Sequence, residues 1–106
     1  MQKRMTTYTT DYDSYMMPSI LITDLKFEDM SITSKVMYTI LVDMAMSQTG
    51  QHILNTPNED KLKRMLNISA FKYKQAKNEL KKLGFLQEIL TQDSRTFILK
   101  DMYTLI

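Results

Sequence analysis

Residues 67–86 read Asn-Ile-Ser-Ala-Phe-Lys-Tyr-Lys-Gln-Ala-Lys-Asn-Glu-Leu-Lys-Lys-Leu-Gly-Phe-Leu, and this stretch decides the expected fold. Ser69 is a residue type favoured at a helix N-cap, and Gly84 stands where a left-handed C-cap residue is expected. Between them, apolar residues recur at spacings of three and four and therefore share one side of a helix. This stripe consists of Tyr73, Ala76, Leu80 and Leu83. The pattern predicts an amphipathic helix over residues 70–83.

The remaining surface of this helix is cationic and carries two amide side chains. It comprises Lys72, Lys74, Gln75, Lys77, Asn78, Lys81 and Lys82. Lysine is attracted to phosphate, and Gln and Asn can pair with the edge of adenine. A lysine-rich helix face is more often a solvated surface, so the neighbouring elements must decide between the two interpretations.

Two further helices are expected before this one. Ser31 can cap a helix from residue 32 to about residue 46, and its wide apolar face indicates a central scaffold. Thr56, Pro57 and Glu59 form a capping-box pattern that predicts a helix extending to about residue 66. The tight turn at residues 67–69 then joins two helices into a helix-turn-helix, in which residues 70–83 are the recognition helix.

Strands are expected on both sides of the helix-turn-helix. A very short strand is predicted at residues 52–54, and a hairpin is predicted from residues 85–91 and 96–100. Residues 92–95 form the polar turn of this hairpin, with Arg95 at its tip. This order of elements predicts a mainly α fold with a small β-hairpin wing, a winged helix-turn-helix, over residues 18–106.

Residues 1–17 show little helical pattern and instead interleave Thr with Tyr. Both residue types favour extended backbone, so we expect an extended or mobile arm, although a disordered terminus fits the composition equally well. The tyrosines could stack on bases or pack on a second subunit. We expect the arm to support a homodimer, because two half-sites multiply a modest single-site specificity.

Composition limits the chemistry that this chain can perform. The net charge of +2 is too small to require a nucleic-acid partner, so any basic surface must arise from how the charged residues are distributed over the fold. The absence of Cys favours a reducing cytoplasmic location, and no segment resembles a signal peptide or membrane span. His52 is the only His, and no Gly-rich phosphate loop is present. We therefore expect no enzyme activity, no catalytic residue, no metal, no cofactor, no membrane partner and no small-molecule ligand.

The helix expected over residues 32–46 carries a more specific pattern. Met30-Ser31 is followed by Lys35, Tyr38, Leu41 and Asp43. This spacing resembles a helix of plasmid and phage replication initiators, in which a Leu-Ser pair precedes Ala-Lys, Tyr, Leu and Asp. Residues 62–86 and the segment Met17-Pro18-Ser19-Ile20-Leu21 also look like parts of that family. Over roughly residues 16–100, the chain resembles the N-terminal winged-helix domain of the replication initiator protein A family from plasmids of Gram-positive bacteria.

The resemblance and the order of elements together predict sequence-specific binding of double-stranded DNA, in the role of origin recognition by a plasmid or phage replication initiator. The expected base-contacting residues are Ser69, Phe71, Lys72, Lys74, Gln75 and Asn78. The expected phosphate-contacting residues are Lys63, Arg64, Lys81, Lys82 and Arg95. Phe71 either meets a thymine methyl group or packs against the first helix or the wing. Two alternatives remain: a stand-alone phage or plasmid transcriptional regulator, and a winged-helix module that binds a host protein.

Overall fold

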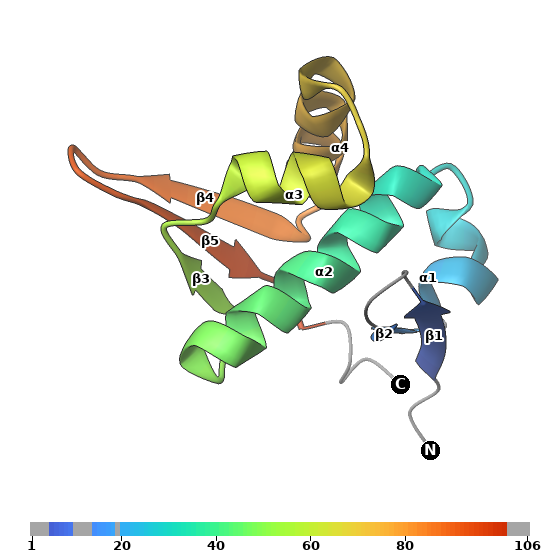
Figure 1. Ribbon diagram of the computed structural model, residues 1–106. Coiled ribbons are helices and arrows are strands. Elements are labelled where there is room, and N and C mark those ends of the chain that lie inside the picture. The colour runs from blue at the N-terminus through green and yellow to red at the C-terminus, as the bar shows by residue number, and fades with distance from the viewer. Residues whose placement is uncertain (1–4, 10–13, 19, 102–106) are drawn as a thin grey trace.

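The structure is a computed structural model that describes residues 5–9, 14–18 and 20–101 (Figure 1). In chain order its elements are β1 (Met5–Thr9), β2 (Ser14–Pro18), α1 (Ile20–Thr23), the 3-10 helix η1 (Leu25–Phe27), α2 (Ile32–Thr49), β3 (Ile53–Asn55), α3 (Glu59–Leu66), α4 (Ala70–Lys82), β4 (Leu86–Leu90) and β5 (Arg95–Leu99). The helix, strand, helix, helix, hairpin order from α2 onward is the one expected from the sequence.

Helix α2 is the scaffold on which the other elements pack. It begins after Ser31, whose side chain accepts a hydrogen bond from the Ser34 backbone N–H, and it ends at Gly50, which is left-handed. It runs to Thr49, beyond the expected end near residue 46. Figure 1 shows it crossing the molecule, with the three-stranded sheet on one side and α1, β1 and β2 on the other. Its fully buried side chains include Met37, Tyr38 and Leu41.

The helix-turn-helix forms as expected, but α3 starts later than the capping pattern suggested. The N-cap is Asn58, whose side chain accepts a hydrogen bond from the Lys61 backbone N–H. Thr56 instead has a φ of 50°, a left-handed conformation that is incompatible with the extended backbone of an N-cap. The expected Thr56–Glu59 capping box is therefore wrong. At the other end, Asn67 is also left-handed, and the chain turns directly into α4.

The C-terminus of α4 closes in a Schellman motif. Gly84 has a φ of 80°, and its N–H bonds the Lys81 carbonyl, while the Phe85 N–H bonds the Leu80 carbonyl. The left-handed glycine is therefore confirmed. Leu83 was expected in the buried stripe, but it is the C-cap residue and is 43% exposed. Its backbone stays in the αR region and its N–H bonds the Glu79 carbonyl, so Leu83 continues the helical spiral, but at a position where its side chain is left partly open to solvent.

The sheet has the strand order β3-β5-β4, with both pairs antiparallel. Strands β4 and β5 form the wing, and β3 pairs with β5 as the opposite edge strand of the sheet. Arg95 is the first residue of β5 and lies opposite Leu90, so its expected position at the tip of the turn is wrong. The fold is mainly helical with a small β-hairpin wing, which confirms the expected winged helix-turn-helix.

One aromatic cluster ties the wing to the scaffold helix. The Phe85 ring lies 5.5 Å from the rings of both Phe27 and Tyr38, measured between centroids. The Tyr38 hydroxyl donates a hydrogen bond to the Lys100 carbonyl just after β5. Phe97, at the centre of β5, is fully buried. These contacts fix the base of the wing against α2.

The described part of the N-terminal arm forms an antiparallel hairpin, in which β1 pairs with β2 from Met5↔Pro18 to Thr9↔Ser14. Met17 is 3% exposed and belongs to the core. The expected boundary between residues 17 and 18 therefore falls inside β2, because Met17 packs with the winged helix. Residues 1–4 and 10–13 of the expected arm lie outside the described residues. Self-association through the arm stays a prediction.

Candidate nucleic-acid interface

Helix α4 presents a polar and aromatic stripe to solvent. Phe71, Gln75, Asn78 and Lys82 recur at alternating spacings of four and three residues, and all are exposed. The buried residues of the same helix are Tyr73, Ala76 and Leu80, which point the opposite way into the core. Phe71 is 74% exposed, so it does not pack against the first helix or the wing. We call Phe71, Gln75, Asn78 and Lys82 the outward stripe.

The other expected base-contacting residues flank the start of this stripe. Ser69 is the N-cap of α4, and its hydroxyl oxygen accepts a hydrogen bond from the Lys72 backbone N–H at 3.1 Å. Lys72 and Lys74 are exposed. Within the described residues, neither of them nor Lys82 forms an ion pair. Their charges are therefore available to an anion that approaches the outward stripe.

Glu79 of α4 connects this helix to the N-terminus of α2 through hydrogen bonds. The Glu79 Oε1 atom accepts hydrogen bonds from the Ser31 backbone N–H at 2.9 Å and from the Ser31 hydroxyl at 3.1 Å. Partial burial raises the pKa of Glu79, but hydrogen bonds from Ser34 and Ser31, with the charge of Lys35, outweigh it and lower that pKa overall. The only carboxylate of α4 is thus committed to a structural contact.

The cations on the wing side of α4 are arranged differently, because two carboxylates bind them. Glu59 pairs with Lys77 at 3.0 Å and with Arg95 at 2.7 Å. Glu88 pairs with Lys77 at 2.9 Å, with Lys81 at 3.0 Å and with Arg95 at 2.9 Å. We call these five residues the ion network. It joins α3, α4, β4 and β5.

Several members of the ion network are largely buried, Glu88 and Lys77 most of all. Burial raises the pKa of Glu88, but hydrogen bonds and charge from Lys77 and Lys81 outweigh it and lower that pKa overall. The pKa of the neighbouring Tyr73 phenol is raised, first by burial and then by the Glu59 carboxylate. Lys77 also lies over the Phe97 ring, 5.4 Å from its centroid.

The expected phosphate-contacting residues therefore fall into two groups. Arg64 and Lys82 are exposed and form no ion pair within the described residues, whereas Lys81 and Arg95 belong to the ion network. Lys63 pairs with Asp60 at 3.1 Å and lies 5.8 Å from the centroid of the Tyr73 ring. Sequence reasoning missed the role of Glu59 and Glu88, because no local pattern shows that both approach the same two cations, Lys77 and Arg95.

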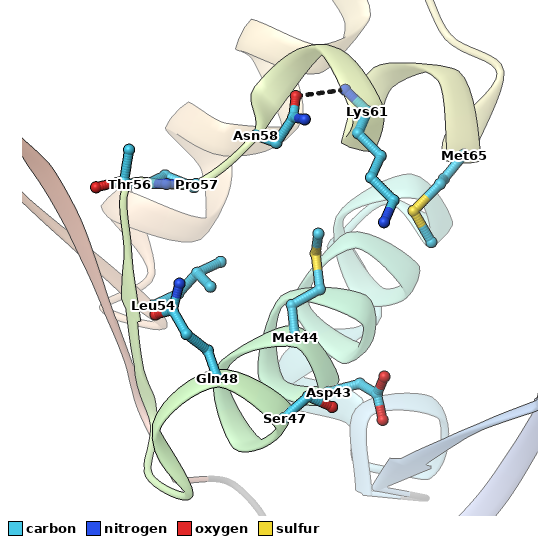
Figure 2. Close-up of a pocket in the computed structure, with 10 residues that line it drawn as sticks. All are labelled: Asp43, Met44, Ser47, Gln48, Leu54, Thr56, Pro57, Asn58, Lys61 and Met65. Carbon is cyan, nitrogen blue, oxygen red and sulfur yellow. Dashed lines mark hydrogen bonds between the residues drawn. The ribbon is translucent and has the colours of Figure 1, made fainter.

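A hollow of about 330 Å³ lies between α3, α4 and the wing. Its lining includes the whole ion network together with Lys63, Tyr73, Lys74 and Asn78. A second hollow, of about 500 Å³, lies between α2 and α3 (Figure 2). Figure 2 shows Lys61 and Met65 of α3 facing Asp43 and Met44 of α2 across it. This second hollow contains no cluster of cations, so it is poorly suited to a polyanion.

The solved structures that share this fold include two whose descriptions refer to DNA. One is described as "N-Terminal domain of DNA binding protein": the TM-score is 0.68 at 20% sequence identity, and the match covers 91% of this chain and 84% of that chain. The other is described as "Structure of Rep-DNA complex". Its TM-score is 0.66 at 22% identity, and the match covers 89% of this chain and 83% of that chain. No protein-family model matches the sequence, and no curated protein is significantly similar to it.

Among the described residues, no group of three or more His, Cys, Asp or Glu side chains is arranged to hold a metal ion. No helix in the same part of the chain is long and apolar enough to cross a membrane.

Proposed function

We propose that this protein binds double-stranded DNA with α4 in the major groove and recognises a specific sequence there. The observation that carries the proposal is the outward stripe, an exposed row of side chains that can contact base edges, on the second helix of a helix-turn-helix. Exposed lysines without carboxylate partners flank it, so attraction to phosphate and reading of bases act at one surface.

The roles within the stripe follow from the chemistry of the base edges. Gln75 and Asn78 can each form a bidentate pair with adenine, and the exposed Phe71 ring can contact a thymine methyl group. Ser69, Lys72 and Lys74 lie at the start of the helix, the part of a recognition helix that typically reaches base edges. Arg64 and Lys82 are the best-placed phosphate contacts, because both are exposed and unpaired within the described residues.

The biological role that fits best is origin recognition by a plasmid or phage replication initiator in the cytoplasm. The Ser31-Lys35-Tyr38-Leu41-Asp43 pattern supports this role, and so does the shared fold with a chain described as part of a Rep–DNA complex. A homodimer, assembled through the N-terminal arm, would bind paired half-sites. We propose no catalytic activity for this domain.

Selection from a random duplex library, followed by titration of the enriched duplex at several salt concentrations, tests the proposal. We expect one enriched sequence, and an affinity that falls with salt by a log–log slope of about one for each phosphate contact. The alternative, a module that binds a host protein, predicts no enriched sequence and no steep dependence on salt. That result would refute the proposed function.

A further inference from the structure

The ion network is unusual because it neutralises cations on the flank of a helix whose other lysines are left unpaired. The Glu88 side chain is only 6% exposed and lies within 3.0 Å of three cationic groups, those of Lys77, Lys81 and Arg95. Glu59 approaches Lys77 and Arg95 from α3. With three cations and two carboxylates, the ion network itself carries one net positive charge.

We infer that Glu59 and Glu88 are specificity-determining residues that withhold Lys77, Lys81 and Arg95 from DNA phosphate. This inference rests on the proposed function and adds a device that suppresses sequence-independent binding. Binding without sequence preference depends almost entirely on the number of phosphates that a protein neutralises. Discrimination between sites therefore improves when cations that do not help base reading are kept occupied.

The position of the network supports this role. Its members line the hollow between α4 and the wing, so a DNA backbone entering there would meet two carboxylates. Lys81 and Arg95 have side chains that are 41% exposed, and either could reach phosphate if its partner were removed. In contrast, Lys72 and Lys82 lie outside this hollow, three residues before Gln75 and four residues after Asn78 on α4. Their phosphate contacts are therefore coupled to the register in which the bases are read.

A purely structural network would have a different signature. Ion pairs that only brace the wing against α4 would, when broken, lower stability and weaken binding to every DNA sequence. If the carboxylates instead withhold the cations from phosphate, breaking the network should strengthen binding to random DNA, because loss of one carboxylate releases a cation to phosphate. The sign of the change in affinity for random duplex thus separates the two explanations.

The test compares Glu88→Gln with Glu28→Gln in the full chain. Glu28 is an exposed glutamate in the turn between η1 and α2, outside the network, and its substitution makes the same change in charge. Fluorescence anisotropy would measure affinity for a random duplex and for the selected duplex at several salt concentrations. We expect Glu88→Gln to bind random duplex about three- to tenfold more tightly and to steepen the salt slope by about one, reducing the specificity ratio. Glu28→Gln should leave both unchanged.

Lys81→Ala supplies a second measurement that does not require the Glu88 variant to fold. In the wild-type background it should change the salt slope by much less than one, because Lys81 is bound to Glu88. In the Glu88→Gln background it should remove the gain in affinity. Unchanged or weaker binding of random duplex by a folded Glu88→Gln variant would overturn the inference, as would a full unit of lost slope for Lys81→Ala alone. Failure of the wild-type chain to bind any duplex would instead refute the proposed function.

Discussion

Replacing Gln75 and Asn78 together with alanine should separate DNA reading from folding. Both side chains are exposed on α4, and no hydrogen bond or ion pair within the described residues uses them. Each bidentate base contact contributes about 1–3 kcal/mol of discrimination, so the double variant should lose about 2–6 kcal/mol, or roughly 30- to 10⁴-fold, for its specific site. No charge is removed, so affinity for random duplex and the salt slope should be preserved.

The same double variant should lose affinity for its specific site but gain stability. Alanine is a better helix former than Gln or Asn, so the two substitutions should stabilise the fold by roughly 0.5–1 kcal/mol and raise the thermal midpoint by a few degrees. Anisotropy with selected and random duplexes, combined with thermal unfolding, measures all three quantities. Gln51→Ala, at an exposed position just after α2, is the matched control. Retention of sequence preference by a stable Gln75→Ala/Asn78→Ala variant would show that the outward stripe does not read bases.

Four other predictions address charge, stability and assembly. Lys72→Glu should weaken binding to all duplexes and reduce the salt slope by at least about one, whereas Lys61→Glu, on the side of α3 that lines the other hollow, should have a much smaller effect in the same titration. The pKa of Glu79 is lowered in the folded state, so the ionised carboxylate stabilises the fold above the usual glutamate pKa, and this stabilisation is lost as pH falls. Glu79→Gln should therefore make the thermal midpoint less dependent on pH on the acid side. The pKa of Tyr73 is raised in the folded state, so the neutral phenol contributes stability that is fully present below the usual tyrosine pKa and is lost as pH rises above about 10. Tyr73→Phe should therefore raise the thermal midpoint at alkaline pH in the same measurement. Deleting residues 1–9 should lower the self-association seen by sedimentation over a dilution series, and an unchanged mass distribution would exclude the arm as the dimer contact.

Helix α4 could be predicted because its signals are local. Ser69 and Gly84 cap the helix through contacts within four residues in the chain, and the apolar spacing of Tyr73, Ala76 and Leu80 identifies the buried side. Its solvent-facing stripe follows directly from the same geometry. The order of the surrounding elements then identified the winged helix without any knowledge of contacts between them.

The ion network could not be predicted, since it joins residues far apart in the chain. Glu59 meets Arg95 across 36 positions and Lys77 across 18, and these contacts exist only after α3, α4 and the wing have packed. Arg95 was misplaced because the turn between β4 and β5 covers residues 91–94, one residue earlier than the polar composition of residues 92–95 suggested. Local sequence thus located the cations of α4 and the wing, whereas tertiary packing determined which of them are paired with carboxylates.

The most direct test of the central claim, that α4 is the DNA-binding surface, is an amide NMR titration of the full chain with a short duplex at low salt. We expect chemical shift changes to concentrate at residues 69–82, with smaller changes in the wing. Phosphate contacts alone suffice for this mapping, so the target sequence need not be known beforehand. Changes confined to the hollow between α2 and α3, lined by Met44, Lys61 and Met65, would contradict the claim, as would a spectrum that the duplex leaves unaltered.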